Sequence, residues 1–191
     1  VLNMIEKFEV YTDVLVLGSG PSGFAAAYSA AKNGAKVILV EQSGDVGGIS
    51  TSGLMSHWTG SCGSPLYYEI LKRTAQNNEG VFKNKITNLI DPEKLKTLYL
   101  EMLCEVGCKV MLYTFAEDAI CDGDKILGAT VINKSGKTDI FAKITIDATG
   151  DGDIAARAGA EFVLGRESDN KMQPATLMFK VSGVDYDRAV F

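Results

Sequence analysis

The chain has 191 residues, of which 46% are hydrophobic and 23% are charged, and its formal net charge at neutral pH is −5. A chain of this size can bury one sizeable core, and its composition is typical of a globular domain rather than of a disordered or membrane-embedded chain. The acidic balance, with no stripe of Lys and Arg side chains, argues against nucleic acid and anionic membranes as partners.

The first residues and the cysteines indicate where in the cell the protein is expected. The first twelve residues contain charged side chains and no continuous apolar run, so we expect neither a signal peptide nor a membrane anchor there. We expect the four cysteines to be free thiols in a reducing compartment. These are Cys62, Cys104, Cys108 and Cys121. Together these features predict a cytoplasmic protein.

The first predicted elements form a strand, a turn, a helix and a second strand. Residues 13–17 form an apolar run that is typical of a parallel strand buried on both faces. After a glycine-rich turn, residues 24–33 form a helix whose small side chains allow close packing on the strand, and Gly34 ends it. Residues 36–41 are a second buried strand. This order predicts a right-handed βαβ crossover.

Residues 43–64 are rich in Gly, Ser and Thr and predict a long loop, of the kind that is usually functional in a compact domain. Two helices are expected after this loop. The first spans residues 66–78. The second begins with Asp91 as its N-cap and Pro92 at its first position, and it ends at Gly107.

A third parallel strand is expected over residues 109–114, after which the hydrophobic period changes to two. Asp-Gly and Ser-Gly turns between alternating apolar runs predict a three-stranded antiparallel meander over residues 117–146. The meander leads into a fourth core strand over residues 144–151 and a short helix over residues 152–159. A further strand is expected within residues 175–184.

A glycine pattern follows the first strand and opens the first helix. Gly18, Gly20 and Gly23 form G-x-G-x-x-G, with Glu41 at the end of the next strand. In this context the glycines permit the tight turn, the approach of a pyrophosphate and close helix–strand packing, while the phosphates meet the positive end of the helix dipole. We expect the Glu41 carboxylate to accept hydrogen bonds from both ribose hydroxyls of an adenosine and to repel the 2′-phosphate of NADP. The pattern therefore predicts a dinucleotide site, against the alternative of a glycine-rich turn without a ligand.

Two downstream motifs bear on the choice between FAD and NAD. A double glycine lies within residues 45–51, and residues 148–151 read Ala-Thr-Gly-Asp at the end of a strand that follows the meander. With these motifs in this order, residues 12–159 resemble FAD-dependent oxidoreductases of the glutathione-reductase-like superfamily, particularly the group related to fumarate reductase flavoproteins and heterodisulfide reductase flavin subunits. The resemblance implies an α/β fold, a Rossmann-like FAD/NAD(P)-binding domain with a parallel sheet flanked by helices and a three-stranded antiparallel meander.

The same resemblance implies FAD as the cofactor and assigns roles to several residues. Glu41 would hold the adenosine ribose, Gln42 would lie against the adenine side, and the backbone of residues 115–116 would meet the adenine edge. The double-glycine segment would contact the pyrophosphate and ribityl region, and the Ala-Thr-Gly turn would lie near the cofactor. The residues expected to bind the cofactor are Gly18, Gly20, Pro21, Ser22, Gly23, Glu41, Gln42, Gly47, Gly48, Ile49, Ser50, Ala116, Ala148, Thr149, Gly150 and Asp151.

Members of this family are much longer and return late to the FAD domain with a Gly-Asp motif that holds the ribityl chain. We therefore interpret residues 1–160 as an FAD-binding domain and residues 161–191 as the truncated start of a substrate domain. Such a chain would hold the ADP moiety but leave the isoalloxazine poorly supported, so we expect an incomplete and inactive piece. In the complete protein the flavin would pass a hydride or electron pair between a small organic substrate and a second redox partner.

Candidate catalytic residues are few. His57 is the only histidine, and an imidazole near a flavin can move a proton at neutral pH, although a loop histidine without a chemical role is the alternative. Trp58 would line the flavin pocket or make a small core contact, and Cys62 is a candidate redox thiol without a second cysteine near it. Cys104 and Cys108 are interpreted as small buried residues rather than zinc ligands, and no metal is predicted.

Three alternatives to a flavoprotein enzyme stay open. They are an NAD-binding dehydrogenase domain, a thiazole-synthase-like protein that uses this fold on an adenylated product, and a non-catalytic dinucleotide-binding module. A hydrolase has no support, because the sequence has no nucleophile elbow.

Overall fold

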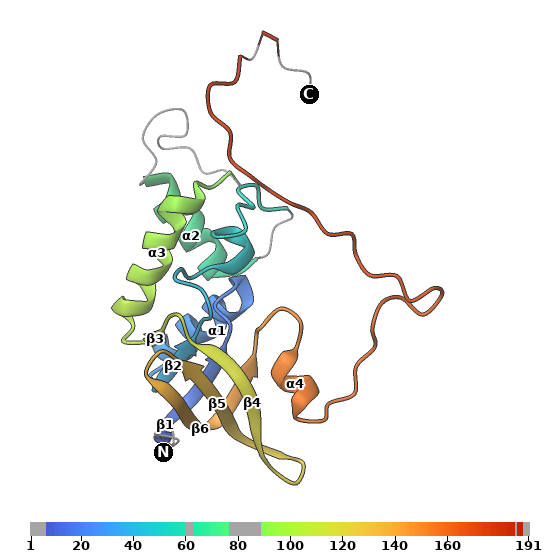
Figure 1. The fold of residues 1–191 in the computed structure, drawn as a ribbon. Coiled ribbons are helices and arrows are strands. Elements are labelled where there is room, and N and C mark those ends of the chain that lie inside the picture. Colours follow the sequence, from blue (N-terminus) through green and yellow to red (C-terminus); the bar gives the residue numbers. More distant parts are fainter. Residues whose placement is uncertain (1–6, 60–62, 77–88, 186, 189–191) are drawn as a thin grey trace.

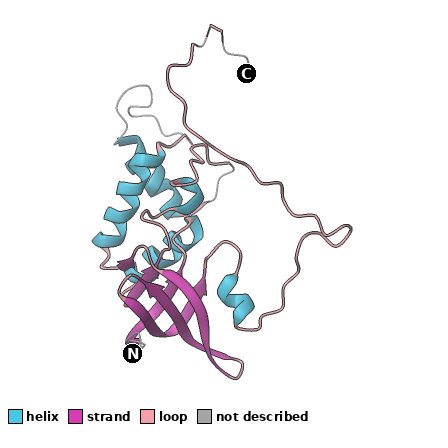
Figure 2. Cartoon of the chain, in the orientation of Figure 1, coloured by secondary structure: helices cyan, strands magenta, loops and turns pink. Residues whose placement is uncertain are grey.

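A computed structural model describes residues 7–59, 63–76, 89–185 and 187–188 of the chain (Figure 1). Within these residues the strands are β1 (Lys7–Leu17), β2 (Val37–Val40), β3 (Lys109–Met111), β4 (Phe115–Asp122), β5 (Lys125–Asn133) and β6 (Gly136–Asp147). The helices are α1 (Pro21–Lys32), the short 3₁₀ helix η1 (Gly48–Ser50), α2 (Pro65–Gln76), α3 (Pro92–Glu105) and α4 (Asp153–Arg157). The described strands form one six-stranded sheet in the order β3-β2-β1-β6-β5-β4. Figure 2 shows α2 and α3 beyond one end of the strands, with α1 between these helices and the sheet.

The parallel part of the sheet follows the predicted βαβ crossover. Strands β3, β2, β1 and β6 are parallel, and the apolar run of β1 lies between β2 and β6. Helix α1 begins at Pro21, earlier than predicted, and Gly34 after its end has φ +90°, the left-handed conformation that suits a glycine there. The predicted cap of α3 is also present, because the side chain of Asp91 accepts a hydrogen bond from the backbone N–H of Glu93 at 3.0 Å.

Two cores lie on the two faces of this sheet. On one face α1, α2 and α3 pack against β1 and β2, and the rings of Phe24 and Tyr99 stack with centroids 3.7 Å apart. On the other face Leu15 and Val40 pack against residues of β5, β6 and α4, including Ile154. Helices α1, α2 and α3 therefore cover one face of the parallel strands, and the meander together with α4 covers part of the other. This arrangement fixes the carboxyl ends of β1, β2 and β6 relative to one another.

Strand β1 is longer than the predicted run of residues 13–17. Its first half pairs in parallel with the start of β6, from Phe8 opposite Thr138 to Thr12 opposite Ala142. The charged and polar residues of this half hide its strand character in the sequence. Pairing with β6 overrides that local signal, because it satisfies the backbone hydrogen bonds of both segments.

The meander is confirmed, with one difference at its end. Strands β4, β5 and β6 are antiparallel neighbours as predicted. The third strand of the meander and the predicted fourth core strand are, however, the single continuous strand β6. The third parallel strand ends at Met111 rather than at residue 114, and Tyr113 then has φ +49°, a conformation outside the strand region.

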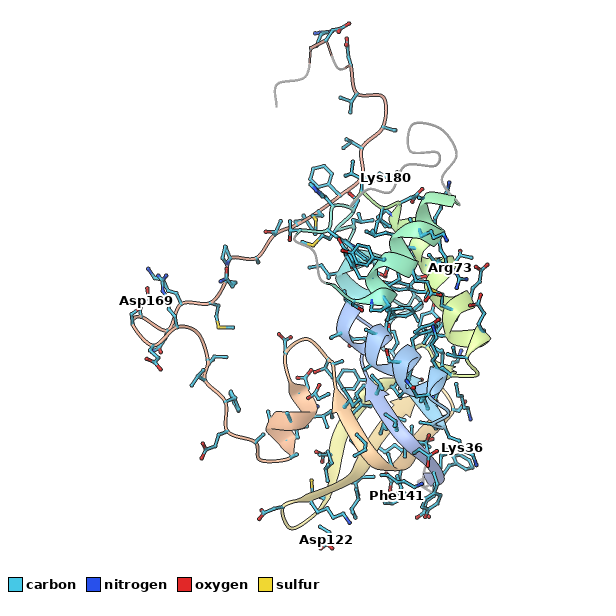
Figure 3. All side chains as sticks on the ribbon, turned by 180° about the vertical axis from the view of Figure 1, so that it is seen from behind. Lys36, Arg73, Asp122, Phe141, Asp169 and Lys180 are labelled. Atoms are coloured by element: carbon cyan, nitrogen blue, oxygen red, sulfur yellow. The ribbon has the colours of Figure 1, made fainter. Side chains whose placement is uncertain are left out.

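The expected strand within residues 175–184 is not formed. The described residues after α4 contain neither helix nor strand and run as an extended segment away from the sheet (Figure 1). Leu177 and Phe179 alternate as in a strand but are 86% and 74% exposed, and a strand requires a partner edge for its backbone groups. A local turn is closed by the paired Arg166 and Asp169, and Figure 3 shows Asp169 far from α1, α2 and α3. The division into two domains stays a prediction.

Candidate functional site

A cleft of about 380 Å³ opens at the carboxyl ends of β1, β2 and β6. Strand β1 connects through α1 to β2 on one side, while β6 comes from much later in the chain to lie on its other side. Such a point, where the connections leave in opposite directions, is where open α/β sheets bind ligands. The cleft is lined by Gly18, Ser19, Gly20, Pro21, Ser22, Val40, Glu41, Gln42, Gly48, Ile49, Thr114, Phe115, Ala116, Ala148, Thr149, Gly150 and Asp153.

The three glycines of the first turn have different environments. Gly18 has φ +92° and donates its N–H to the carbonyl of Val40 at 2.8 Å. A Cβ atom at Gly23 would collide with the carbonyl oxygen of Gly18, so this glycine permits close helix–strand packing. A Cβ atom at Gly20 would meet no protein atom within 4 Å. Only Gly20 therefore has free space beside its Cα.

The start of α1 faces this cleft without a cap. Gly20 occupies the N-cap position, no side chain caps the helix, and its first turn contains no acidic residue. The first N–H groups of a helix lack partners within the helix and carry the positive end of its dipole. Because Pro21 and Ser22 line the cleft, this end of α1 is available to an anion.

Glu41 is held in the wall of the cleft by three protein donors. Its Oε2 accepts hydrogen bonds from the backbone N–H of Ser19 at 2.9 Å and from the hydroxyl of Ser19 at 2.6 Å, and its Oε1 accepts one from the N–H of Ser43 at 2.7 Å. Burial raises the pKa of the carboxyl, but the hydrogen bonds from Ser19 and Ser43 outweigh it, so the pKa lies below its ordinary value. The side chain is therefore ionised at neutral pH.

This bonding limits what Glu41 can offer to a ligand. A carboxylate has about four lone-pair positions, and three are used by the protein. Oε1 keeps room for one further donor. A second hydroxyl of the ligand would have to donate to Oε2, which already accepts two hydrogen bonds from Ser19.

The double glycine packs directly on the first turn. Gly47 has φ +110° and donates its N–H to the carbonyl of Ser19 at 2.8 Å. A Cβ atom at Gly48 would lie 2.9 Å from the Cα of Gly20. Gly48 and Ile49 therefore line the cleft, whereas Gly47 and Ser50 are buried behind it.

The Ala-Thr-Gly turn after β6 forms the facing wall. Ala148, Thr149 and Gly150 line the cleft, and Asp153 lines it in place of the predicted Asp151. The turn is held by Asp147, which has no place in the sequence-based set of site residues. Its carboxylate accepts hydrogen bonds from the turn and from the start of α4.

Most of the predicted cofactor residues are thus brought together. Those that line the cleft are Gly18, Gly20, Pro21, Ser22, Glu41, Gln42, Gly48, Ile49, Ala116, Ala148, Thr149 and Gly150, and those that do not are Gly23, Gly47, Ser50 and Asp151. Sequence reasoning missed Ser19, Val40, Thr114 and Asp153. Ser19 lies inside the glycine pattern, so its position was a usable signal. Thr114 lies between β3 and β4, where the sequence predicted the end of a strand, and Asp153 is the first residue of α4.

His57 does not line this cleft. It is exposed, and its backbone pairs with Leu89 in an isolated bridge. Its neighbours Met55 and Trp58 line a second cavity of about 370 Å³, which shares Pro21 and Ile49 with the cleft. A catalytic role for His57 stays a prediction.

Of the cysteines, Cys108 is buried as predicted, and burial raises the pKa of its thiol to about 11. Cys104 is exposed rather than buried, because it lies on the outer side of the last turn of α3. Cys62 lies outside the described residues. In the part of the chain that the structure describes, no three His, Cys, Asp or Glu side chains are grouped to hold a metal ion. No helix within the same residues is long and apolar enough to cross a membrane.

The family model of FAD dependent oxidoreductases matches residues 13–191 of this chain. The chain is 30% identical over 158 residues to digeranylgeranylglycerophospholipid reductase of Picrophilus torridus. The aligned region covers 74% of this chain and 40% of that protein. The chain is 31% identical over 202 residues to digeranylgeranylglycerophospholipid reductase 2 of Methanosphaera stadtmanae, covering 93% and 48%. It is 29% identical over 152 residues to thiamine thiazole synthase of Methanococcus maripaludis, covering 72% and 55%. The chain spans about half the length of these relatives.

Solved structures share the fold. A geranylgeranyl bacteriochlorophyll reductase-like protein from Thermoplasma acidophilum superposes with a TM-score of 0.58 at 21% identity, over 80% of this chain and 43% of that one. THI4 from Thermovibrio ammonificans also gives a TM-score of 0.58, at 24% identity, over 82% and 67%. These neighbours confirm the predicted Rossmann-like architecture.

Proposed function

This chain belongs to the FAD-dependent oxidoreductase family, and on that premise we propose that its cleft binds FAD through the ADP moiety. We further propose that the complete protein transfers a hydride or electron pair to or from a small organic substrate. Because the flavin must return to its starting state in each cycle, a second redox partner completes the reaction. FAD supplies the electron-transfer chemistry, and the protein supplies binding, orientation and electrostatics.

The observation that carries the proposal is the open space at Gly20 beside the uncapped start of α1. A diphosphate needs N–H donors, positive potential and a backbone without side chains at the point of contact. Gly20 and Ser22 offer these features on one side of the cleft, and Thr149 and Gly150 form its other side. The residues present therefore fit a nucleoside diphosphate.

The adenosine end is supported by Glu41 and its surroundings. The carboxylate is ionised and keeps an acceptor position on Oε1, which suits a ribose hydroxyl. A 2′-phosphate at that place would meet a negative charge, so we favour FAD over NADP. Gln42, Phe115 and Ala116 lie along the same part of the lining and would flank the adenine.

His57 is retained in this proposal as the candidate group for proton transfer. Its neighbours Met55 and Trp58 line the apolar cavity next to the cleft, which supports a position close to a reacting ring.

The test uses Gly20 because its substitution separates folding from binding. Gly20 has φ −55°, which any residue can adopt, so Gly20→Val is expected to fold, with a modest loss of thermal stability because Val is a poorer N-cap residue than Gly. Its side chain would fill the space proposed for the diphosphate, and FAD affinity measured by flavin fluorescence is expected to fall at least about a hundredfold. Gly63→Val is the control, because Gly63 also has open space but does not line the cleft. A Gly20→Val protein that binds FAD like the wild type would refute the proposal.

A thiazole-synthase-like activity is the second candidate. It is favoured by the 29% identity to the Methanococcus maripaludis thiamine thiazole synthase, which covers 72% of this chain. Mass spectrometry of the nucleotide released on denaturing the purified protein separates the two readings. FAD supports the oxidoreductase, whereas another adenylated compound supports the thiazole-synthase-like protein.

A further inference from the structure

We infer that Asp147 is a positioning residue that holds the Ala148-Thr149-Gly150 turn in a cofactor-ready conformation. The inference rests on the proposed function, since it takes the cleft to be the FAD site. Asp147 is the last residue of β6 and does not itself line the cleft. It therefore acts through the residues that it holds.

The carboxylate of Asp147 accepts four hydrogen bonds. Its Oδ1 accepts from the backbone N–H of Thr149 at 3.0 Å and from the Thr149 hydroxyl at 2.7 Å. Its Oδ2 accepts from the N–H groups of Ile154 at 2.9 Å and Ala155 at 2.7 Å. The Thr149 hydroxyl in turn accepts from the N–H of Asp153 at 3.1 Å. One side chain thus connects the turn to the first residues of α4.

The reason for this arrangement lies in the cap of α4. Gly152 occupies the N-cap position with φ +71° and has no side chain to accept from the helix. Without Asp147, the N–H groups of Ile154 and Ala155 would lose their acceptor at the start of the helix. Asp147, at the end of β6, supplies that cap. Its hydrogen bonds to α4 therefore restrict the conformation of residues 148–152, which lie between the strand and the helix.

The other side of the turn is fixed to the glycine pattern. Ala148 donates its N–H to the carbonyl of Leu17 at 2.8 Å, and a Cβ atom at Gly18 would collide with the carbonyl oxygen of Ala148. The turn therefore lies between two rigid supports, Asp147 and the end of β1. Thr149 and Asp153, the two residues tied together by the hydroxyl, both line the cleft. Loss of the Asp147 carboxylate would free this wall while leaving the uncapped start of α1 in place.

The primary experiment compares Asp147→Asn with the wild type. The amide has nearly the shape of the carboxylate but places an NH₂ group against N–H donors, so half of the acceptors are lost. We expect the Kd for FAD, measured by flavin fluorescence well below the unfolding temperature, to rise about tenfold, the effect of losing hydrogen bonds to a charged acceptor. The visible circular dichroism of the protein saturated with FAD is expected to change as well, because the cofactor would meet a displaced wall.

Asp91→Ala is the matched control. It removes another carboxylate that accepts from a helix N-terminus, that of α3, outside the cleft. It is expected to lower the unfolding temperature but to leave the Kd for FAD and the visible circular dichroism unchanged. An Asp147→Asn protein with wild-type Kd and circular dichroism overturns the inference, whereas a wild-type protein that fails to bind FAD overturns the proposed function instead.

A second measurement needs no variant. In the FAD-free wild type, hydrogen exchange at the amides of Thr149, Ile154 and Ala155 is expected to be slowed at least about tenfold relative to an unstructured peptide. Protection before the cofactor binds supports a turn that is already in place. Exchange at the unprotected rate, with protection appearing only when FAD is added, contradicts the inference even where Asp147→Asn fails to fold.

Discussion

The carbonyl oxygen of Ala148 lies against the Cα of Gly18, so closely that a Cβ atom at Gly18 would overlap it. This contact joins the glycine-rich turn after β1 to the Ala-Thr-Gly turn after β6. The two turns, distant in the sequence, form facing walls of the same cleft.

Gly18→Ala is expected to lower the free energy of unfolding by about 3 kcal/mol, because it combines a strained φ of +92° with a backbone collision. Gly34→Ala is the matched control. Gly34 has φ +90° but open space around it, so the cost there is about 1 kcal/mol, from conformation alone. Urea unfolding measures both values. Equal losses in the two variants would mean that the contact with Ala148 has no steric importance.

Glu41→Gln is expected to weaken binding of ADP about tenfold, because it removes a charged acceptor from the ribose site. It is also expected to reduce discrimination against 2′-phosphorylated ADP, since the repelling charge is lost. Isothermal titration calorimetry with both nucleotides measures the two effects. Glu105→Gln, which removes an exposed partner of Arg73, is the control and is expected to leave both affinities unchanged. A wild-type protein that binds both nucleotides equally well contradicts the role of Glu41.

Stability is expected to decline in acid through Asp147 and Glu41. Burial raises the pKa of each carboxyl, but hydrogen bonds to the ionised form outweigh it, so both pKa values lie below their ordinary ones. Groups with a lowered folded-state pKa stabilise the protein above their unfolded pKa, and this stabilisation is lost as the pH falls through the folded pKa. The free energy of unfolding should therefore fall progressively below about pH 4, where unfolded Asp and Glu begin to bind protons.

Urea unfolding over a series of pH values measures this decline. The difference in unfolding free energy between the wild type and Asp147→Asn should shrink as the pH falls, because the wild-type carboxylate then becomes protonated in both states. A difference that stays constant down to about pH 2 would show that Asp147 is not ionised in the native protein.

The cysteines are expected to differ in reactivity. Cys104 and Cys121 are exposed, whereas Cys108 is buried and its thiol has a pKa of about 11. Since the thiolate is the reactive form, iodoacetamide at mildly alkaline pH should modify Cys104 and Cys121 first and Cys108 only after unfolding. Peptide mass spectrometry follows each site. Early modification of Cys108 in the folded protein would contradict its burial.

Short-range patterns were sufficient for the central unit of this protein. The apolar run of residues 13–17, the glycine pattern after it and Glu41 at the end of the next strand predicted the crossover and the site, because strand, turn and helix preferences act over a few residues. The Asp91-Pro92 cap and the hairpin turns were predictable for the same reason. These local signals agree with the fold that forms.

Tertiary structure decided what depends on residues distant in the chain. The first half of β1 became a strand only through its pairing with β6. The alternating residues around Leu177 have no partner strand among the described residues, and they do not form a strand. The same holds within the site. Ser19 occupies one oxygen of Glu41, and Asp147 caps a helix across a turn, because hydrogen bonds depend on positions in space that residue type and spacing do not specify. The sequence by itself indicated which residues to expect at a nucleotide site, and the packing of β1, β2 and β6 determined which of them meet at the cleft.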